Sequence, residues 1–215
     1  MATIQLQPTS IGAMRAFPRS TSRDLALVAT FTGLVAALGL VPAFYPAGIP
    51  VPITAQSLGV MLAGAVLGRW RGAAALVLLL ALAAVGLPVL AGGRGGLGVF
   101  AGPSVGYLIG FPAAAWVIGW LTEKGGAPYR FVWGLIANVV GGIVVLYALG
   151  IPGTAWRAHI PIQAAAIGSA WYVVGDLAKA VVAALVARGV HAAYPGLLGE
   201  RPARTRTRRG ESTPV

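Results

Sequence analysis

The stretch from Ala164 to Ala187 reads AAAIGSAWYVVGDLAKAVVAALVA. It is long enough for an α-helix to cross the hydrocarbon core of a bilayer, which takes roughly 20 residues, and its only charged residues are Asp176 and Lys179. A charged side chain at the bilayer centre costs roughly 2.5 to 3.5 kcal/mol even on a lenient insertion scale. The stretch therefore predicts a membrane-spanning helix, and its two charges are functional candidates because intramembrane ionisable groups are rare.

The composition of the whole chain agrees with a membrane protein. Of the 215 residues, 57% are hydrophobic and 10% are charged, and the mean hydropathy is +0.80, whereas soluble domains carry about 25% charged residues. The chain has no cysteine, which excludes disulfides, thiolate metal sites and thiol nucleophiles. We expect no metal ion and no bound cofactor.

The apolar runs predict an all-α bundle of six transmembrane helices. Runs of roughly 17 to 25 residues span a bilayer as helices. The runs are Leu25 to Tyr45, Ile53 to Leu67, Gly72 to Leu90, Ser104 to Leu121, Phe131 to Gly150 and Ala164 to Ala187. The second run is short by this rule, which makes it a candidate for a tilted or partly re-entrant helix.

Basic residues in the connections orient this bundle, because lysine and arginine near helix ends are retained on the cytoplasmic side. When the segments alternate, thirteen basic residues fall on one side and only Arg94 and Arg157 fall on the other. The thirteen are Arg15, Arg19, Arg23, Arg69, Arg71, Lys124, Arg130, Arg188, Arg201, Arg204, Arg206, Arg208 and Arg209. The bias supports an even number of spans and predicts that both termini are cytoplasmic.

This organisation gives a cytoplasmic segment at 1–24, a six-helix membrane domain at 25–188 and a basic cytoplasmic tail at 189–215, which we expect to be disordered. The tail contains RPARTRTRRG, but short basic tails beside a last helix are more often topology signals or contacts with anionic lipid. We therefore expect no nucleic-acid partner. We also expect the first helix to be retained, because no A-x-A site follows the first apolar run closely.

Two short motifs suggest other functions. GRGGLG at 93–98 matches G-x-G-x-x-G, but it follows an apolar helix, and no acidic residue lies nearby to hold a ribose. GPSVG at 102–106 matches G-x-S-x-G and would make Ser104 the nucleophile of an intramembrane hydrolase. That chemistry usually needs a base, and the only histidines are His159 and His191. We keep the hydrolase as a remote alternative and expect that the protein is not an enzyme.

The two long connections on the side with few basic residues are candidates for covering a pocket. Half of the residues between Gly92 and Pro103 are glycine, which lets a backbone approach a ligand closely, and the only charge there is Arg94. A flexible connector is the simpler interpretation, but this lone cation favours a ligand anion. Four prolines stiffen the earlier connection VPAFYPAGIPVPITAQ at 41–56.

Three blocks occur in this order: VPITAQSLGVMLAGAVLG at 51–68, GLPVLAGGRGGLGVFAGPSVGYLIGF at 86–111 and GDLAKA at 175–180. With these separations the chain resembles the BioY family, the biotin-binding membrane subunits of energy-coupling factor vitamin transporters. The resemblance covers about residues 25–188. Ser57 and Ser104 stand where the family is expected to have threonine, a conservative change that keeps a hydroxyl.

The resemblance implies a six-helix substrate-binding subunit in the cell membrane of a bacterium or archaeon. Its outward-facing pocket would be closed by the two outer connections, and it would deliver biotin with a second membrane subunit and two ATPase subunits. The chain has no G-x-x-x-x-G-K-[ST] phosphate loop, so ATP chemistry belongs to those partners. A binding subunit for another vitamin and a transporter that works alone remain alternatives.

Asp176 and Lys179 are three residues apart and therefore share a helical face. They could be a purely structural ion pair. If the ligand is biotin, the carboxylate suits the ureido N–H donors, the ammonium suits the ureido carbonyl, and Arg94 suits the valerate carboxylate.

Aromatic and amide residues complete the predicted site. The candidates for the apolar lining are Phe44, Tyr45, Tyr107 and Tyr172, of which Tyr172 lies four residues before Asp176 and so shares its face. Each aromatic could instead be an anchor at the bilayer interface. Gln56 and Asn138 would line the same cavity or form hydrogen bonds between helices.

A stripe of small residues on the first helix is a candidate docking face. Ala29, Gly33 and Ala37 recur every four residues and permit close approach of another helix. Packing within the bundle would explain the spacing equally well. The family resemblance favours docking of the coupling subunit.

Overall fold

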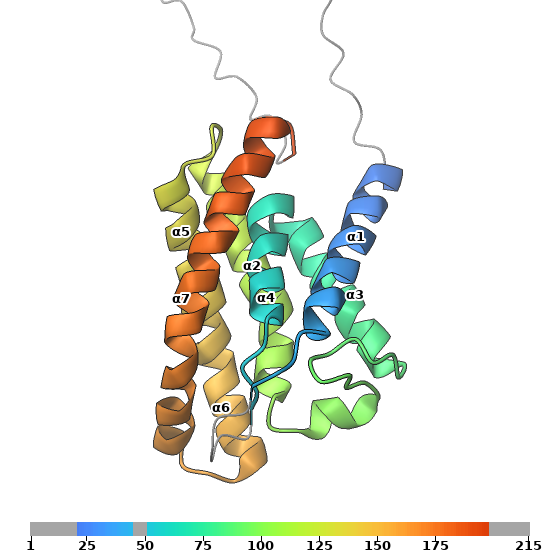
Figure 1. The fold of residues 1–215 in the computed structure, drawn as a ribbon, viewed down its shortest axis with the longest axis vertical. Coiled ribbons are helices and arrows are strands. Elements are labelled where there is room, and N and C mark those ends of the chain that lie inside the picture. The colour runs from blue at the N-terminus through green and yellow to red at the C-terminus, as the bar shows by residue number, and fades with distance from the viewer. Residues whose placement is uncertain (1–20, 45–50, 198–215) are drawn as a thin grey trace, which may run out of the picture.

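The computed structural model describes residues 21–44 and 51–197, and these two ranges form an all-helical bundle (Figure 1). Within them no β-strand forms. Extended chain pairs in two isolated antiparallel bridges, Phe44 with Ile53 and Leu90 with Arg94. Both bridges lie in the connections beside the site described below.

The helices follow the predicted runs with shifted ends. They are α1 (Thr21–Gly39), α2 (Gln56–Leu67), α3 (Arg69–Ala84), the 3₁₀ turn η1 (Leu97–Ala101), α4 (Val105–Gly125), α5 (Phe131–Val139), the π-helical turn η2 (Val140–Val145), α6 (Leu146–Ala158) and α7 (Ile162–Ala193). The last run is one long helix, and α5, η2 and α6 form one continuous helical stretch from Phe131 to Ala158. Two predicted ends were too late. The first helix ends at Gly39, shortly before Pro42, which disfavours a helix in the residues before it. The third helix ends at Ala84, shortly before Gly86, whose positive φ of 102° is not helical.

Among the described residues, four helices are long and apolar enough to cross a membrane: α1, α4, Phe131–Ala158 and α7. The protein is therefore a membrane protein. With 12 and 16 residues, α2 and α3 are shorter. The count of six spans stays a prediction.

The short helix α2 lies inside the bundle, which explains how a helix of 12 residues is accommodated. Every residue of α2 except Leu58 is buried, and the helix contacts α1, α3, α4 and α7. Small residues permit this close packing, since a Cβ added at Gly64 would lie 2.6 Å from the carbonyl oxygen of Ala115 on α4. A helix that contacts mainly other helices does not need to match the bilayer thickness.

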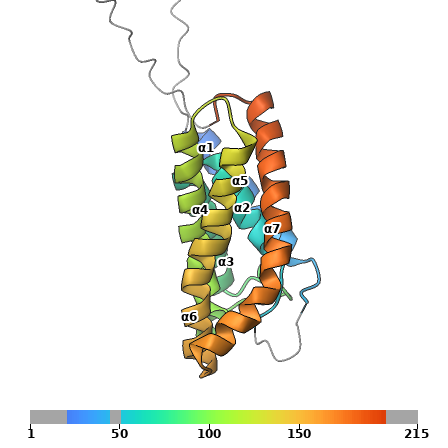
Figure 2. The same cartoon turned by 90° about the vertical axis from the view of Figure 1, so that its left-hand side faces the viewer.

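The two described chain ends lie at the same end of the bundle, at the top of Figure 1. Arg71 at the start of α3 pairs there with Asp24 in the first turn of α1 at 3.2 Å and also donates to the carbonyl oxygen of Leu197. The connection 85–104 lies at the opposite end. Figure 2 shows α7 running along the height of the bundle beside the α5–α6 stretch.

Candidate functional site

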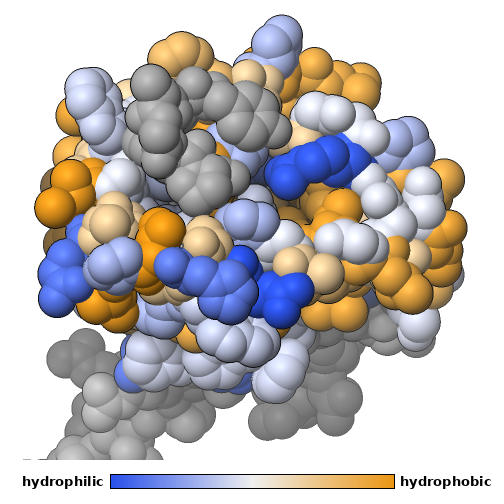
Figure 3. Space-filling model, turned by 90° about the horizontal axis from the view of Figure 1, so that it is seen from below, coloured by the Kyte–Doolittle hydropathy of each residue, from blue (hydrophilic) through white to orange (hydrophobic). Residues whose placement is uncertain are grey.

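A pocket opens at the end of the bundle that carries the connection 85–104, and its volume including the open mouth is about 580 Å³. Its polar lining residues are Thr54, Gln56, Ser57, Arg94, Ser104, Tyr107, Tyr147, Tyr172, Asp176 and Lys179. Its apolar lining residues are Val51, Pro52, Ile53, Leu90, Ala91, Leu108, Phe111 and Leu146. Seen from below, this face of the molecule carries hydrophilic residues among apolar ones (Figure 3).

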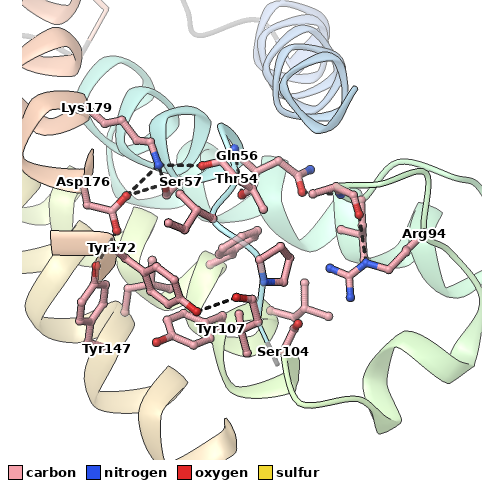
Figure 4. Close-up of a pocket in the computed structure, with 18 residues that line it drawn as sticks. Thr54, Gln56, Ser57, Arg94, Ser104, Tyr107, Tyr147, Tyr172, Asp176 and Lys179 are labelled. Atoms are coloured by element: carbon pink, nitrogen blue, oxygen red, sulfur yellow. Dashed lines mark hydrogen bonds and ion pairs between the residues drawn. The ribbon is translucent and has the colours of Figure 1, made fainter. Parts of the chain in front are cut away.

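Asp176 on α7 is the centre of a polar network in the wall of the pocket (Figure 4). The residue is only 4% exposed. Its Oδ1 accepts hydrogen bonds from Ser57 Oγ and from Lys179 Nζ, each at 2.9 Å, and its Oδ2 accepts one from Tyr147 Oη at 2.7 Å. Buried charges are tolerated when they are paired and hydrogen-bonded, and this carboxylate is both.

Lys179 has used its three donors within the chain. Its Nζ donates to Asp176 Oδ1 at 2.9 Å, to Ser57 Oγ at 2.9 Å and to the carbonyl oxygen of Thr54 at 2.7 Å. An ammonium group has three N–H bonds, so a ligand acceptor has to replace one of these partners. Asp176 Oδ2 has one donor and can accept a second from a ligand.

Three tyrosines from three helices form the aromatic wall. Tyr107 of α4, Tyr147 of α6 and Tyr172 of α7 pack edge to face, with ring centroids 6.1 to 6.4 Å apart. The hydroxyls of Tyr172 and Tyr107 already have partners within the chain. Tyr172 donates to the carbonyl oxygen of Val51 at 2.6 Å, and Tyr107 lies 2.9 Å from Ser169 Oγ. The rings therefore give the pocket a rigid apolar surface suited to a non-polar ring or chain.

Gln56, at the start of α2, joins α1 and the connection 85–104 at the edge of the pocket. Its Nε2 donates to the carbonyl oxygens of Val35 at 3.2 Å and Val89 at 3.0 Å, while its Oε1 accepts from the backbone N–H of Ala91 at 2.9 Å. Both donors and one lone pair of the amide are thus engaged by the backbone. The residue lines the pocket, and its main contacts are structural.

Arg94 reaches the pocket from a tight turn of the glycine-rich connection. Gly92 and Gly93 adopt left-handed backbone angles (φ 76° and 69°), which a residue with a Cβ rarely adopts. The turn is closed by the bridge between Leu90 and Arg94, and Arg94 Nε donates to the carbonyl oxygen of Ala91 at 3.0 Å. Its terminal nitrogens make no hydrogen bond with the described residues, so they can bind an anion.

The structure brings six of the nine predicted substrate-contact residues to one pocket: Gln56, Arg94, Tyr107, Tyr172, Asp176 and Lys179. Phe44 does not line it and is 64% exposed. Asn138 is fully buried away from the pocket, and its Nδ2 donates to the carbonyl oxygen of Ala180 on α7. Of the two roles expected for Asn138, the structure has the hydrogen bond between helices. Tyr45 lies outside the described residues.

The small-residue stripe lies on the outside of the bundle. Ala29, Gly33 and Ala37 are all exposed, and a Cβ added at Gly33 would meet no atom within 4 Å. The stripe therefore does not pack against another helix within the described bundle.

Three pocket residues were not predicted from the sequence: Tyr147, Ser57 and Thr54. Tyr147 sits in an apolar run 29 residues before Asp176, and no local spacing connects the two. Ser57 and Thr54 are more than 100 residues away from Lys179 in the chain. A signal was present for Ser57 and Thr54, since both belong to the block at 51–68 that helps to carry the family resemblance.

Comparisons with known proteins agree on one family. The family model described as "BioY family" matches residues 11–196. The "Biotin transporter BioY" of Rhizobium etli is 49% identical over 180 residues, which cover 81% of this chain and 96% of that protein. The protein of the same description from Rhodobacter capsulatus is 50% identical and covers 82% of this chain and 97% of its own length.

A solved structure also matches. The structure described as "Crystal structure at 2.1 A of the S-component for biotin from an ECF-type ABC transporter" has a TM-score of 0.76 and 32% sequence identity, and the match covers 80% of this chain and 92% of that chain. The likeness therefore extends over most of the bundle that forms the pocket.

Proposed function

The chain belongs to the BioY family, and from this premise we propose that it is the biotin-binding membrane subunit of an energy-coupling factor transporter. The observation that carries the proposal is the buried Asp176–Lys179 pair, which lines a pocket together with Arg94. An isolated structural pair would not need a cavity beside it or a second cation facing the same space.

The polar groups match the two ends of biotin. The ureido ring offers two N–H donors and a carbonyl acceptor. Asp176 Oδ2 has an open lone pair that can accept a hydrogen bond from a ureido N–H. Lys179 can donate to the ureido carbonyl once it gives up one of its present acceptors. The tyrosine wall suits the thioether ring and the aliphatic chain. The terminal nitrogens of Arg94 suit the carboxylate.

We propose six membrane spans with both termini cytoplasmic and the pocket facing outward. In support, both described chain ends lie at the same end of the bundle, and Arg94 and Arg157 lie away from that end. The thirteen other connecting basic residues favour the cytoplasmic side. The location that follows is the cell membrane of a bacterium or archaeon, with the membrane domain at 25–188 and the basic tail at 189–215.

The proposed partners are a transmembrane coupling subunit and two ATPase subunits. The exposed stripe Ala29, Gly33 and Ala37 supports close approach of a partner helix on α1, because small side chains let two backbones pack tightly. ATP hydrolysis is assigned to the partners, since the sequence has no phosphate-binding loop of the P-loop type.

The hydrolase alternative based on Ser104 is not favoured. A serine nucleophile needs an adjacent base, and neither histidine lines the pocket. His159 is exposed, and His191 is bonded through Nε2 to the carbonyl oxygen of Ala65 at 2.9 Å.

Equilibrium binding to the purified chain tests the proposed function. Biotin should bind saturably to the full chain in detergent or nanodiscs, and thiamine, riboflavin and folate should not compete with it. Absence of saturable biotin binding would overturn the proposal. Preferential binding of another vitamin would support the alternative of a different substrate. Uptake by membranes that contain this chain alone would identify a stand-alone transporter.

A further inference from the structure

Ser104 has a buried hydroxyl that the protein itself does not use. The residue is 5% exposed and lines the pocket, yet its Oγ has no hydrogen-bond partner among the described residues. Buried polar groups are hydrogen-bonded in the great majority of cases, and an unpaired one costs stability. An open buried hydroxyl in a pocket wall is therefore a candidate contact for a ligand.

The usual structural role of a serine at this position does not apply. Ser104 directly precedes α4, where a serine side chain normally accepts a hydrogen bond from a backbone N–H of the first turn. Here the side chain makes no such capping bond, and its backbone already has helical angles (φ −79°, ψ −2°). The hydroxyl is thus left unpaired although a common local partner is nearby.

The other polar side chains of the pocket have hydrogen-bond partners within the described chain, among them Gln56, the tyrosines and the Asp176 network. The terminal nitrogens of Arg94 have no acceptor among the described residues, and the buried hydroxyl of Ser104 has no partner there at all, whereas the partly buried hydroxyl of Thr54 accepts the backbone N–H of Gln56. Figure 4 shows both residues on the side of the pocket away from Asp176 and Lys179. The two ends of the pocket therefore differ: one is an internally satisfied ionic network, and the other has unsatisfied donors.

The surroundings of Ser104 favour a negatively charged ligand group. The N-terminal end of a helix carries a partial positive charge, and Ser104 lies at this end of the 21-residue helix α4. The guanidinium of Arg94 adds a full positive charge on the same side of the pocket. A hydroxyl donor in such a setting forms its strongest hydrogen bond with an anionic oxygen.

We propose that Ser104 binds the carboxylate of the ligand, with Oγ donating a hydrogen bond to one oxygen while Arg94 engages the same group. This inference rests on the proposed function, since biotin supplies the carboxylate, and it adds a contact residue at the end of the pocket opposite Asp176. Ser104 is a binding residue in this proposal and performs no chemical step.

The proposal makes an unusual prediction for Ser104→Ala. Because the hydroxyl is buried and unpaired in the ligand-free chain, its removal should leave the melting temperature unchanged or raise it. The same change should weaken biotin binding by about tenfold or more, the range expected for a lost hydrogen bond to a charged group. A residue with a structural role would show a lower melting temperature together with the weaker binding.

The experiment compares two ligands and two variants of the full chain. Biotin and an analogue whose carboxylate is replaced by a methyl group are titrated into the parent, Ser104→Ala and Thr122→Val. Thr122 is the matched control, because its hydroxyl is also buried and unpaired on α4 but does not line the pocket. We expect Ser104→Ala to weaken biotin strongly and the methyl analogue by less than about twofold, and Thr122→Val to change neither.

Equal weakening of both ligands by Ser104→Ala overturns the assignment to the carboxylate, and so does unchanged binding of biotin. A lowered melting temperature with equal loss of both ligands indicates a structural role and also overturns it. These results differ from failure of the proposed function, in which the parent chain itself does not bind biotin.

Discussion

Tyr147 of α6 donates a 2.7 Å hydrogen bond to Oδ2 of Asp176 on α7. The carboxylate is thereby held between two helices, with Ser57 of α2 on its other oxygen. A buried carboxylate that is fixed from three helices has one preferred orientation, which is what a site needs to read the donors of a ligand.

The Tyr147 bond can be removed with little change of shape by Tyr147→Phe. Hydrogen bonds to charged groups contribute about 1.5 to 3 kcal/mol, so the variant should have a lower melting temperature and bind biotin about tenfold more weakly. Tyr129→Phe is the control, because the Tyr129 hydroxyl is buried without a partner among the described residues and lies outside the pocket. Titration calorimetry measures the affinity of both variants, and unchanged affinity in Tyr147→Phe would contradict a role in orienting Asp176.

The double variant Asp176→Lys with Lys179→Asp tests whether the two charges only neutralise each other or also bind the ligand. We expect the exchanged protein to insert and fold but to lose biotin binding, because it places an ammonium opposite N–H donors and a carboxylate opposite a carbonyl. Each mismatched buried polar group costs about 1 to 3 kcal/mol. Elution profile and melting temperature monitor folding, and an exchanged variant that binds biotin like the parent would show that the pair is structural.

Gln56→Met tests the structural role of the Gln56 amide. Methionine has a similar length but cannot replace the bonds to Val35, Val89 and Ala91. We expect faster hydrogen exchange of the Ala91 amide and weaker biotin binding, because the turn that presents Arg94 loses its anchor. Gln163→Met, at an exposed position in the first turn of α7, is the control. Unchanged exchange at Ala91 would rule out this anchoring role.

Gly33→Leu tests the docking face on α1. The added side chain has open space in the isolated chain, so biotin binding should stay within about twofold of the parent, as expected for a change that disturbs no internal contact. Assembly with the coupling subunit and uptake should fall, because the bulk prevents close helix approach. Gly189→Leu, an exposed glycine on α7 with equal space, should assemble normally. Loss of biotin binding in Gly33→Leu would instead indicate packing within the bundle.

Single cysteines test the topology without interference, since the chain has none of its own. Leu97→Cys lies in the connection near the pocket and Ser22→Cys in the first turn of α1, and both positions are exposed. A membrane-impermeant maleimide added to intact cells should label position 97 and leave position 22 unlabelled until the cells are opened. Labelling of both positions from outside would refute the proposed orientation.

The sequence determined those features that depend on local order along the chain. Long apolar runs specify helices wherever water is absent, because the backbone groups must then be satisfied within the segment. The helical period placed Tyr172 and Asp176 on one face, and the structure has both in the pocket wall. The lone cation of the glycine-rich connection, Arg94, could be selected because it was exceptional in its surroundings.

Only the tertiary structure decided which side chains meet across the bundle. The period of a helix fixes which residues share a face, but it does not fix which neighbour that face contacts. Asn138 and Gln56 were similar candidates in the sequence, yet one bonds to Ala180 away from the pocket and the other fastens the connection beside it. Tyr147 donates to Asp176 because α6 packs beside α7. The hydroxyl of Ser104 is unpaired because no polar group of the described helices packed around it lies within hydrogen-bond distance. Such contacts depend on the shapes of all the packed surfaces together, which no local pattern contains.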